Sequence, residues 1–328
     1  MRVAIVGAGI AGLSCAEELR SKGFTVRLYD KGRGLGGRMA TRRVATELGE
    51  ASFDHGAQYF TARDPAFSEQ VNRWNRDGLA ERWPVAGEDA WVGTPGMNSL
   101  IKAMAASQDV VLGVRIESIE RLDKGWKLRH AAAIEGPFDA LVLAIPAEQS
   151  AALLSLHDFG LARIALHARS QPCWSGLFAF DKVLAAPDTP IRDTGIISWA
   201  VRDSAKPGRQ GPEAWLVQAQ PDWTRQWLES DSQWVAEQLL ESLGEALGLS
   251  DLRPVAATAH RWRFAMSSGT GDGALWCAEK KLGACGDWLL GPRVECAWLS
   301  GRVLAQRMLE GQSVASGQEF AQNRAGNG

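Results

Sequence analysis

A glycine-rich turn near the start of the chain constrains the fold more than any other feature. The apolar residues 3–6 lead directly into a Gly-x-Gly-x-x-Gly motif at residues 7–12, and a segment with helical spacing follows. This order of strand, turn and helix binds a dinucleotide, because the glycines permit the tight turn and a close approach of backbone to the pyrophosphate. A second apolar strand, residues 25–29, ends at Asp30, where an acid binds ribose hydroxyls. We therefore predict a βαβ unit for NAD or FAD.

Length and charge limit the remaining possibilities. The 328 residues exceed what one core of ordinary size organises, which favours two domains. Thirty-six basic and 38 acidic residues give a net charge of -2, so no global field attracts nucleic acid or anionic lipid. No stretch approaches the roughly 18 apolar residues of a spanning helix, and no leader pattern opens the chain. We expect no nucleic-acid or membrane partner and an N-terminus that is part of the fold.

The cysteines and histidines indicate neither disulfides nor a metal site. Five scattered cysteines without a Cys-x-x-Cys pair are typical of a reduced, cytoplasmic protein. The five histidines lack metal-ligand spacing. Sequence motifs of serine hydrolases and P-loop NTPases are also missing. We predict a cytoplasmic protein with no bound metal.

The periodicity beyond the first βαβ unit predicts further strands of the first domain, then the short strands and long helix of a second domain, and finally a strand and a helix that belong to the first domain again. The expected strands are 110–114, 116–122, 126–129 and 140–145, followed by short strands at 175–180, 195–201 and 215–219. One long amphipathic helix is expected over 223–247, then a strand at 283–287 and a helix at 294–309. Polar and small residues beyond Glu310 predict a frayed tail.

A second glycine- and arginine-rich loop, residues 31–41, favours FAD over NAD as the bound dinucleotide. A simple NAD dehydrogenase has no need of such a loop. Its Gly-Gly-Arg-Met-Ala-Thr stretch at residues 36–41 resembles the flavin-containing amine oxidase superfamily, in which a similar stretch lies along the FAD pyrophosphate. The resemblance implies that Lys31 lies near the ribose and Arg38 near the phosphates. The alternative for Arg38 is an ordinary solvated loop charge.

Further segments share this resemblance. Residues 54–60 resemble the segment beneath the flavin ring, residues 91–97 a return to the cofactor, and residues 286–301 a Gly-Asp turn and helix at the ribityl and pyrimidine end. The position of Cys296 differs from that of covalent family members, which favours noncovalent FAD. His55 is interpreted as an orienting or packed histidine rather than a catalytic one, because no partner for catalysis is visible. The resemblance implies these cofactor contacts: Gly7, Gly9, Ile10, Ala11, Gly12, Asp30, Lys31, Gly37, Arg38, Met39, His55, Gly56, Ala57, Met97, Val114, Gly286, Asp287, Arg293, Val294 and Cys296.

The resulting fold class is α/β, with a Rossmann-like FAD-binding domain of the glutathione reductase-like, amine oxidase type. A second, α+β substrate domain is expected on a mainly antiparallel sheet. The FAD-binding domain is predicted to be discontinuous, over residues 1–64, 91–164 and 260–310. The substrate domain takes residues 65–90 and 165–259, and residues 311–328 form the tail.

Within the superfamily, the chain looks most like the bacterial renalases. The resemblance rests on compact length, on residues 53–63 (Phe-Asp-His-Gly-Ala-Gln-Tyr-Phe-Thr-Ala-Arg) and on residues 261–265 (Arg-Trp-Arg-Phe-Ala). It implies an FAD-dependent oxidase that converts isomeric dihydronicotinamide dinucleotides, the 1,2-dihydro and possibly the 1,6-dihydro forms of NAD(P), to NAD(P)+. Oxygen would receive the electrons and form hydrogen peroxide.

The residues suit such chemistry. A dihydropyridine expels hydride with a push from its own ring nitrogen, so orientation and water exclusion matter more than a strong base. We therefore assign no catalytic acid or base. The predicted substrate contacts are Gln58, Tyr59, Thr61, Arg263 and Trp288. Most of the 14 tryptophans are expected to be core residues, and one or two could stack on a nicotinamide or adenine.

Two alternatives stay open. One is an amine oxidase, whose site typically encloses the amine with aromatic residues, often tyrosines, and often has a lysine near the flavin. With only Tyr29 and Tyr59 present, a paired tyrosine cage is hard to build. The other is a non-catalytic FAD-binding redox sensor, against which the substantial second domain argues.

Overall fold

The computed structural model describes the backbone of residues 1–325 and the side chains of residues 1–311. Its residues form two compact units, each built from separate stretches of chain. The dinucleotide unit comprises Met1–Gly34, Met104–Arg169 and Ser268 onward, and the sheet unit comprises Leu35–Ala103 and Ser170–Ser267. None of the described helices combines the length and apolar character needed to cross a membrane.

The dinucleotide unit is organised by a six-stranded sheet of order β17-β18-β11-β1-β2-β7. The strands are β1 (Arg2–Val6), β2 (Thr25–Asp30), β7 (Asp109–Leu112), β11 (Ala140–Leu143), β17 (Leu275–Cys277) and β18 (Leu282–Ala284). All neighbouring strands are parallel except the pair β17 and β18. The central strands β1 and β11 are almost wholly buried, which explains their continuous apolar sequence.

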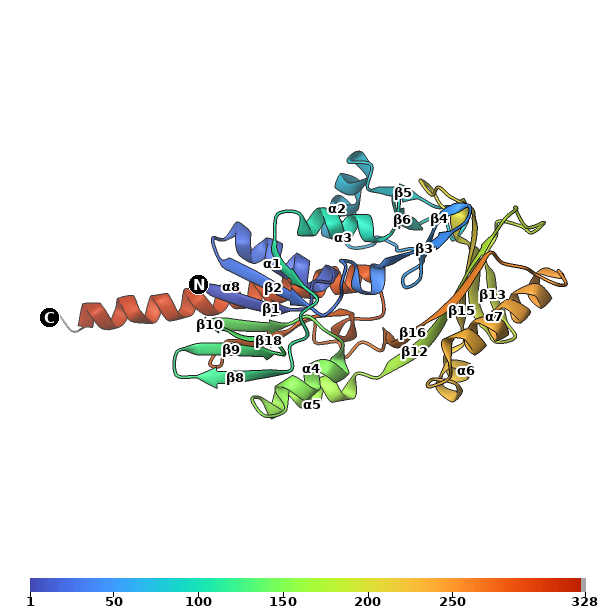
Figure 1. Cartoon of the computed structure of the whole chain (residues 1–328). Coiled ribbons are helices and arrows are strands. Elements are labelled where there is room, and N and C mark those ends of the chain that lie inside the picture. Colours follow the sequence, from blue (N-terminus) through green and yellow to red (C-terminus); the bar gives the residue numbers. More distant parts are fainter. Residues whose placement is uncertain (326–328) are drawn as a thin grey trace. The chain divides into compact units, whose positions relative to one another are not determined.

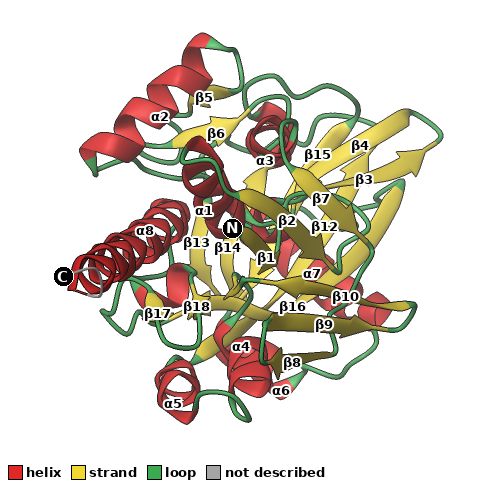
Figure 2. Cartoon of the chain, turned by 90° about the vertical axis from the view of Figure 1, so that its left-hand side faces the viewer, coloured by secondary structure: helices red, strands yellow, loops and turns green. Residues whose placement is uncertain are grey.

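Helices α1 (Ile10–Ser21) and α8 (Val294–Ala325) lie side by side in this unit (Figures 1 and 2). They cross closely at Gly301, where an added Cβ would lie 2.1 Å from the Ala11 carbonyl oxygen. The predicted helix 294–309 is therefore present but continues, and residues 311–325 of the predicted tail are helical backbone. Residues 326–328 of that tail lie outside the described residues.

A small antiparallel sheet and two helices complete the dinucleotide unit. The sheet has the order β10-β9-β8. These elements are β8 (Ser118–Leu122), β9 (Gly125–His130), β10 (Ala133–Phe138), α4 (Ala147–Leu154) and α5 (Phe159–His167). Strand β10 was not predicted, because its sequence, AIEGPF, lacks alternation and contains glycine and proline.

The sheet unit is built on a five-stranded antiparallel sheet of order β13-β14-β15-β12-β16. The strands are β12 (Ser170–Phe180), β13 (Ile191–Thr194), β14 (Ile197–Arg202), β15 (Glu213–Ala219) and β16 (Ala256–Ser267). Alternate residues of β12 serve two cores: Phe178 packs with residues of α7 (Ser232–Leu247), and Leu177 packs with residues of β4 (Gly49–Asp54). Helix α7 lies along one face of this sheet (Figure 1).

The other face is covered by the hairpin of β3 (Thr41–Thr46) and β4, whose strands pair antiparallel. The remaining elements of the sheet unit are α2 (Pro65–Arg76), β5 (Ala80–Arg82), β6 (Trp91–Gly93), α3 (Asn98–Ala105), α6 (Pro221–Gln226) and three-residue helical turns at Gly37–Met39 and Asp203–Ala205. A third such turn, Asp287–Leu289, belongs to the dinucleotide unit.

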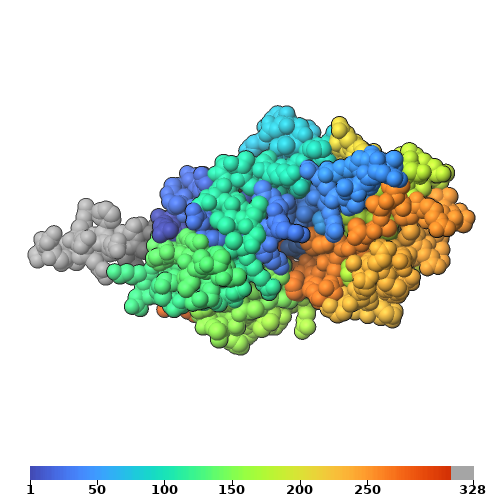
Figure 3. Space-filling model, viewed as in Figure 1, coloured from blue at the N-terminus to red at the C-terminus, as the bar shows by residue number. Residues whose placement is uncertain are grey.

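The predicted single helix over 223–247 is wrong. The structure has two helices there, α6 and α7, which contribute to the surface in Figure 3, in gold. Asp231 separates them, because its side chain accepts hydrogen bonds from the backbone N–H groups of Gln233 (2.8 Å) and Trp234 (3.2 Å) and so begins a new helix. Helical periodicity on both sides of this N-cap concealed the break.

The predicted fold class is confirmed: a Rossmann-like parallel sheet and a mainly antiparallel second sheet are both present. The predicted domain boundaries remain a prediction. The compact units assign residues 35–64 and 91–103 to the sheet unit, whereas the prediction groups them with the FAD-binding segments.

Candidate functional site

The glycine turn of the dinucleotide unit has the geometry that the sequence predicts. Gly7 has a φ of +106°, and its N–H donates to the Tyr29 carbonyl at 2.7 Å. A Cβ at Gly12 would lie 2.1 Å from the Gly7 carbonyl oxygen, so Gly12 is required for packing of α1. A Cβ at Gly9, in contrast, would have no atom within 4 Å apart from its own neighbours in the chain, among the residues that the structure describes. The space beside Gly9 is open for a ligand.

Asp30 is oriented by the backbone of the same unit. Its two carboxylate oxygens accept hydrogen bonds from the N–H groups of Ala8 (2.8 Å) and Gly32 (2.7 Å). The N–H of Val114 donates to the Asp30 carbonyl at 2.9 Å, which brings the end of the predicted strand 110–114 to this acid. Lys31 lies next to it, 3.4 Å from the amide oxygen of Gln149.

These residues fit the adenosine diphosphate part of FAD. Helix α1 begins at Ile10 without a side-chain cap, which leaves the backbone N–H groups of residues 10–12 available for an anion. Ile10 and Ala11 are nearly buried, so their contribution comes from the backbone. Open space beside Gly9, an uncapped helix start and a fixed carboxylate together form a pyrophosphate and ribose cradle.

The C-terminal Gly-Asp turn is also held in place within the dinucleotide unit. The Gly286 N–H donates to Ser300 Oγ at 2.9 Å, and this hydroxyl donates to the Gly273 carbonyl at 2.6 Å. Asp287 directly follows and is nearly buried. Ser300 belongs to α8, so this helix fixes the turn that the sequence predicts at the cofactor.

Trp288 is a correction to the predicted substrate contacts. Its side chain is only 1% exposed, belongs to the apolar core of the dinucleotide unit and donates through Nε1 to the Ile145 carbonyl at 3.2 Å. A side chain so enclosed has no surface left for a substrate. Nearby, Arg293 Nε donates to the sulfur of buried Cys296 at 3.3 Å, and Val294 begins α8.

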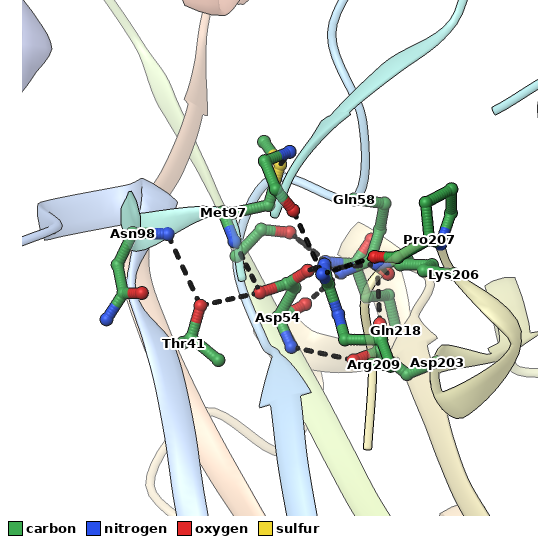
Figure 4. A network of polar contacts seen from close by, with 12 residues as sticks. Thr41, Asp54, Gln58, Met97, Asn98, Asp203, Lys206, Pro207, Arg209 and Gln218 are labelled. Atoms are coloured by element: carbon green, nitrogen blue, oxygen red, sulfur yellow. Dashed lines mark hydrogen bonds and ion pairs between the residues drawn. The ribbon is translucent and has the colours of Figure 1, made fainter. Parts of the chain in front are cut away.

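In the sheet unit, the end of β4 carries a fully buried group of four charges, which we call the ionic cluster (Figure 4). Its members are Asp54, Asp203, Lys206 and Arg209, and their side chains are at most 1% exposed. Lys206 Nζ lies 2.5 Å from Asp203 and 3.5 Å from Asp54, and Arg209 also pairs with Asp54. Two carboxylates and two cations leave the group neutral overall.

Asp54 connects this cluster to segments predicted to contact the flavin. One carboxylate oxygen accepts from Thr41 Oγ1 (2.7 Å) and from the Met97 N–H (3.0 Å). Burial alone would raise the pKa of Asp54, but Lys206, Arg209 and these two hydrogen bonds lower it below its usual value. The ionised carboxylate therefore fixes β3, the segment after β4 and the start of α3.

Gln58 is a second correction. Its side-chain amide nitrogen donates to the carbonyls of Asp54 and Gly56, and its amide oxygen accepts from Lys206 at 3.2 Å. The side chain is buried, and both polar atoms are engaged within the protein, so Gln58 supports the ionic cluster rather than contacting substrate.

Gly56 lies where the sequence predicts it, but for a different reason. A Cβ there would meet the Arg38 carbonyl oxygen at 2.0 Å, and the adjacent Ala57 N–H donates to the same carbonyl at 2.8 Å. The glycine thus permits the loop around Gly37, Arg38 and buried Met39 to pack against this segment. Close packing of protein on protein, not only approach of a flavin, requires the missing side chain.

His55 belongs to a compact aromatic group in the same unit. Its ring centre lies 4.6 Å from that of His260 and 5.0 Å from that of Trp262, and these two rings are 4.6 Å apart. Burial, then His260 and Arg42, lower the pKa of His55 to about 4, and burial and Arg42 lower the pKa of His260 to about 4. Both imidazoles are neutral at pH 7.

The other predicted substrate residues of the sheet unit are dispersed. The Tyr59 ring packs 5.5 Å from the Trp199 ring, and Thr61 is half-buried nearby in sequence. Arg263 is exposed and forms two hydrogen bonds with Glu229, at 2.6 and 2.8 Å. Substrate contact by these three residues stays a prediction.

Several residues of the sheet unit were missed by sequence analysis. Asp203, Lys206 and Arg209 form a D-x-x-K-x-x-R pattern that resembles an ordinary solvated loop, and their partner Asp54 is about 150 positions earlier. His260 and Trp262 alternate along β16, a signal that could have placed them on one sheet face.

Comparison with known proteins agrees with this architecture. Residues 5–74 match a family of NAD(P)-binding Rossmann-like domains. Residues 79–309, well over half of the chain, match the flavin containing amine oxidoreductase family. The chain belongs to this flavin containing amine oxidoreductase family. Membership confirms the predicted superfamily, implies FAD as the cofactor and makes the protein an FAD-dependent oxidoreductase.

Solved structures of low sequence identity share the fold. A cyclohexylamine oxidase from Brevibacterium oxydans IH-35A has a TM-score of 0.70 at 13% identity, covering 95% of this chain and 99% of the other. A protein provisionally described as a protoporphyrinogen oxidase, from Exiguobacterium sp. 255-15, has a TM-score of 0.73 at 14% identity, covering 94% and 99%. A fatty acid isomerase from P. acnes has a TM-score of 0.66 at 13% identity, covering 93% and 98%.

A curated relative matches a shorter region. The small chain of NADPH glutamate synthase from Azospirillum brasilense is 25% identical over 151 residues. The match covers 42% of this chain and 31% of the relative, so the chain spans about a third of that protein's length.

Proposed function

We propose that this protein is a renalase-like, FAD-dependent oxidase of isomeric dihydronicotinamide dinucleotides. Its substrates would be 1,2-dihydro, and also 1,6-dihydro, forms of NAD(P), its products NAD(P)+ and, with oxygen as acceptor, hydrogen peroxide. Family membership supplies the flavin chemistry. The resemblance of residues 53–63 and 261–265 to bacterial renalases supplies the substrate class.

The tyrosines and the lysine that an amine oxidase site would need are not available among the residues that the structure describes, and this observation favours a dihydronicotinamide over an amine as the substrate. Tyr29 is 1% exposed, in the core of the dinucleotide unit, where its hydroxyl donates to Glu135 at 3.2 Å. Only Tyr59 is left of the two tyrosines in the sequence, so a paired tyrosine cage is excluded. Lys206 is wholly buried between Asp203 and Asp54, which removes it as a lysine facing substrate.

The neutral aromatic group around His55 suits a dihydropyridine. When bound, FAD supplies a two-electron acceptor that takes a hydride and passes both electrons to oxygen. The substrate's own ring nitrogen drives hydride loss, so the protein has to orient the ring and exclude water. With a pKa of about 4, His55 and His260 stay uncharged and do not oppose the positive charge that develops on the nicotinamide ring.

Noncovalent binding of FAD is part of the proposal. Cys296 is buried and its sulfur accepts a hydrogen bond from Arg293, an arrangement that leaves the thiol engaged within the protein. We propose that Gly9, Asp30 and Asp287 hold the cofactor in the dinucleotide unit. The protein should be yellow and should release FAD on denaturation without proteolysis.

An anaerobic titration tests the function. The 2- and 6-dihydro isomers of NADH and NADPH should rapidly abolish the visible flavin absorption, and ordinary 4-dihydro NADH should act far more slowly. Readmission of oxygen should restore the absorption and release one hydrogen peroxide per substrate oxidised.

The same titration separates the alternatives. Loss of absorption with simple primary amines, and none with the dihydro isomers, would make the protein an amine oxidase and overturn the proposal. No response to either class would favour a non-catalytic FAD-binding protein.

A further inference from the structure

The five-stranded sheet of the sheet unit, called the large sheet below, has a polar region on the face opposite α7. Ala257 and Ala259 of β16 pack with the core beneath α7, so the alternating residues His260 and Trp262 face the other way. Ala256 shares that second face and packs with residues of β4. The floor of this region is therefore aromatic and lies on the side covered by the β3–β4 hairpin.

The hairpin adds a cation above this floor. Residues paired directly across an antiparallel hairpin project to the same face. Arg42 pairs with Phe53, which packs against the large sheet, so Arg42 also projects toward the sheet. Arg43 alternates to the opposite face, where it is exposed and lies 3.3 Å from Glu50. The Arg42 guanidinium lowers the pKa of both histidines, as expected for a charge beside them.

Arg42 has a charge that the protein leaves uncompensated. The residue is half-buried, yet its side chain forms no ion pair or hydrogen bond with any residue that the structure describes. Its neighbours His55 and His260 are neutral, whereas the other cations at this hairpin, Arg43, Lys206 and Arg209, all have carboxylate partners. A half-buried, unpaired guanidinium favours an anionic ligand, and its planar donors suit a phosphate.

The hydrogen bonds of His55 define what else the ligand must offer. The Nδ1 atom of the imidazole is buried and has no hydrogen-bond partner among the residues that the structure describes. In the tautomer protonated at Nε2, Nδ1 is an acceptor without a donor, and only 6% of the residue is exposed. A buried acceptor is costly unless a ligand supplies an N–H or O–H group.

The backbone of His55 is held in place by two hydrogen bonds. Its backbone carbonyl accepts hydrogen bonds from Trp262 Nε1 at 2.7 Å and from Ser175 Oγ at 3.0 Å. Two hydrogen bonds to one carbonyl fix the backbone of His55 before any ligand arrives, which lowers the entropic cost of binding.

We propose that Arg42, His55, His260 and Trp262, the histidine–arginine cluster, bind the nicotinamide nucleotide end of the substrate. The carboxamide N–H donates to His55 Nδ1, the rings of His260 and Trp262 contact the nicotinamide, and Arg42 binds the adjacent phosphate. A carboxamide, an aromatic ring and a phosphate are the three groups that this cluster complements. The inference rests on the proposed function and names the residues that select its substrate.

Binding of non-reacting ligands to the FAD-loaded protein tests the phosphate contact. The probes are nicotinamide mononucleotide and nicotinamide riboside, which lacks the phosphate, with Kd measured by calorimetry. Arg42→Met should weaken mononucleotide binding roughly tenfold and leave the riboside unchanged. Arg43→Met, on the other face of the same strand, is the matched control and should change neither value.

A second ligand pair tests the carboxamide contact. Nicotinic acid mononucleotide carries a carboxylate, which cannot donate to Nδ1, so the wild type should bind the amide roughly tenfold more tightly. His55→Phe should abolish this preference. His55→Asn should restore part of it, because the amide oxygen of Asn lies near the position of Nδ1.

The outcomes distinguish this inference from the function on which it rests. Variants that retain FAD but keep wild-type Kd values for all ligands would overturn the assignment of the cluster, while the flavin titration still supports the function. A loss of FAD affinity, with unchanged nicotinamide discrimination, would assign the cluster to the cofactor and also overturn the inference. A wild type that binds no nicotinamide nucleotide and ignores the dihydro isomers would overturn both.

Discussion

The glycine turn of the dinucleotide unit and the ionic cluster of the sheet unit represent two ways of building a site. The turn uses backbone groups within about 30 consecutive residues, and its acidic residue, Asp30, accepts hydrogen bonds from the N–H groups of Ala8 and Gly32. The ionic cluster uses side chains about 150 positions apart, Asp54 and the Asp203–Arg209 loop. The first is fixed by local sterics, and the second exists only when the whole sheet unit is folded.

The comparison therefore predicts different costs of substitution. At the turn, the stability cost of replacing a glycine should depend on whether the added Cβ has space around it. A change in the ionic cluster should be costly because it leaves a buried charge without its partner.

The largest effect is expected at Lys206. Lys206→Met leaves Asp203 buried without its cation at 2.5 Å and should lower the free energy of unfolding by about 3 to 5 kcal/mol. Denaturant unfolding monitored by tryptophan fluorescence measures it. The double variant Asp203→Asn/Lys206→Met removes both charges and should lose much less. Equal losses in the two variants would show that the pair is not coupled.

A somewhat smaller effect is expected at Gly12. Gly12→Ala places a Cβ 2.1 Å from the Gly7 carbonyl oxygen and should lower the free energy of unfolding by about 3 kcal/mol. Gly9→Ala is the matched control, because its Cβ enters open space. It should leave stability within about 0.5 kcal/mol but weaken FAD binding roughly tenfold. Stability loss at Gly9 equal to that at Gly12 would contradict the assignment of the open space to the cofactor.

In the sheet unit, the lowered pKa of His55 should also make stability depend on pH. The pKa of His55 falls from 6.5 in the unfolded chain to about 4 in the folded protein, so only the unfolded state takes up a proton between these values. Stability should fall as the pH is lowered from 6.5 to 4, by roughly 1 to 3 kcal/mol from this residue. His55→Asn should flatten that part of the pH profile in denaturant titrations.

The smallest stability effect is expected at Asp287. Asp287→Asn preserves size and removes the charge, so the free energy of unfolding should change little, while FAD should bind roughly tenfold more weakly. Fluorescence titration of the apoprotein with FAD measures this. Unchanged affinity would show that the Gly-Asp turn does not contact the cofactor.

Sequence reasoning succeeded where local rules govern the chain. Strands β1, β2 and β11 and the turn at residues 7–12 follow from apolar runs and glycine spacing, and Asp30 lies where the motif predicts it. It failed for helix 223–247, where the N-cap Asp231 interrupts a continuous periodicity. It also placed Gln58 and Trp288 against substrate, although both side chains are enclosed by partners distant in sequence.

The sequence by itself determined the Rossmann-like fold, the flavin family and the location of the dinucleotide turn, because these depend on backbone geometry within a few tens of residues. The tertiary structure alone decided which polar residues meet. Strand register places Arg42 and Phe53 on one face of the hairpin and Thr41 and Asp54 on the other, so neighbours in sequence serve two different clusters. Adjacent residues of a strand point to opposite faces of the hairpin. Only the tertiary structure shows that one face packs against β16 and the other against the Asp203–Arg209 loop.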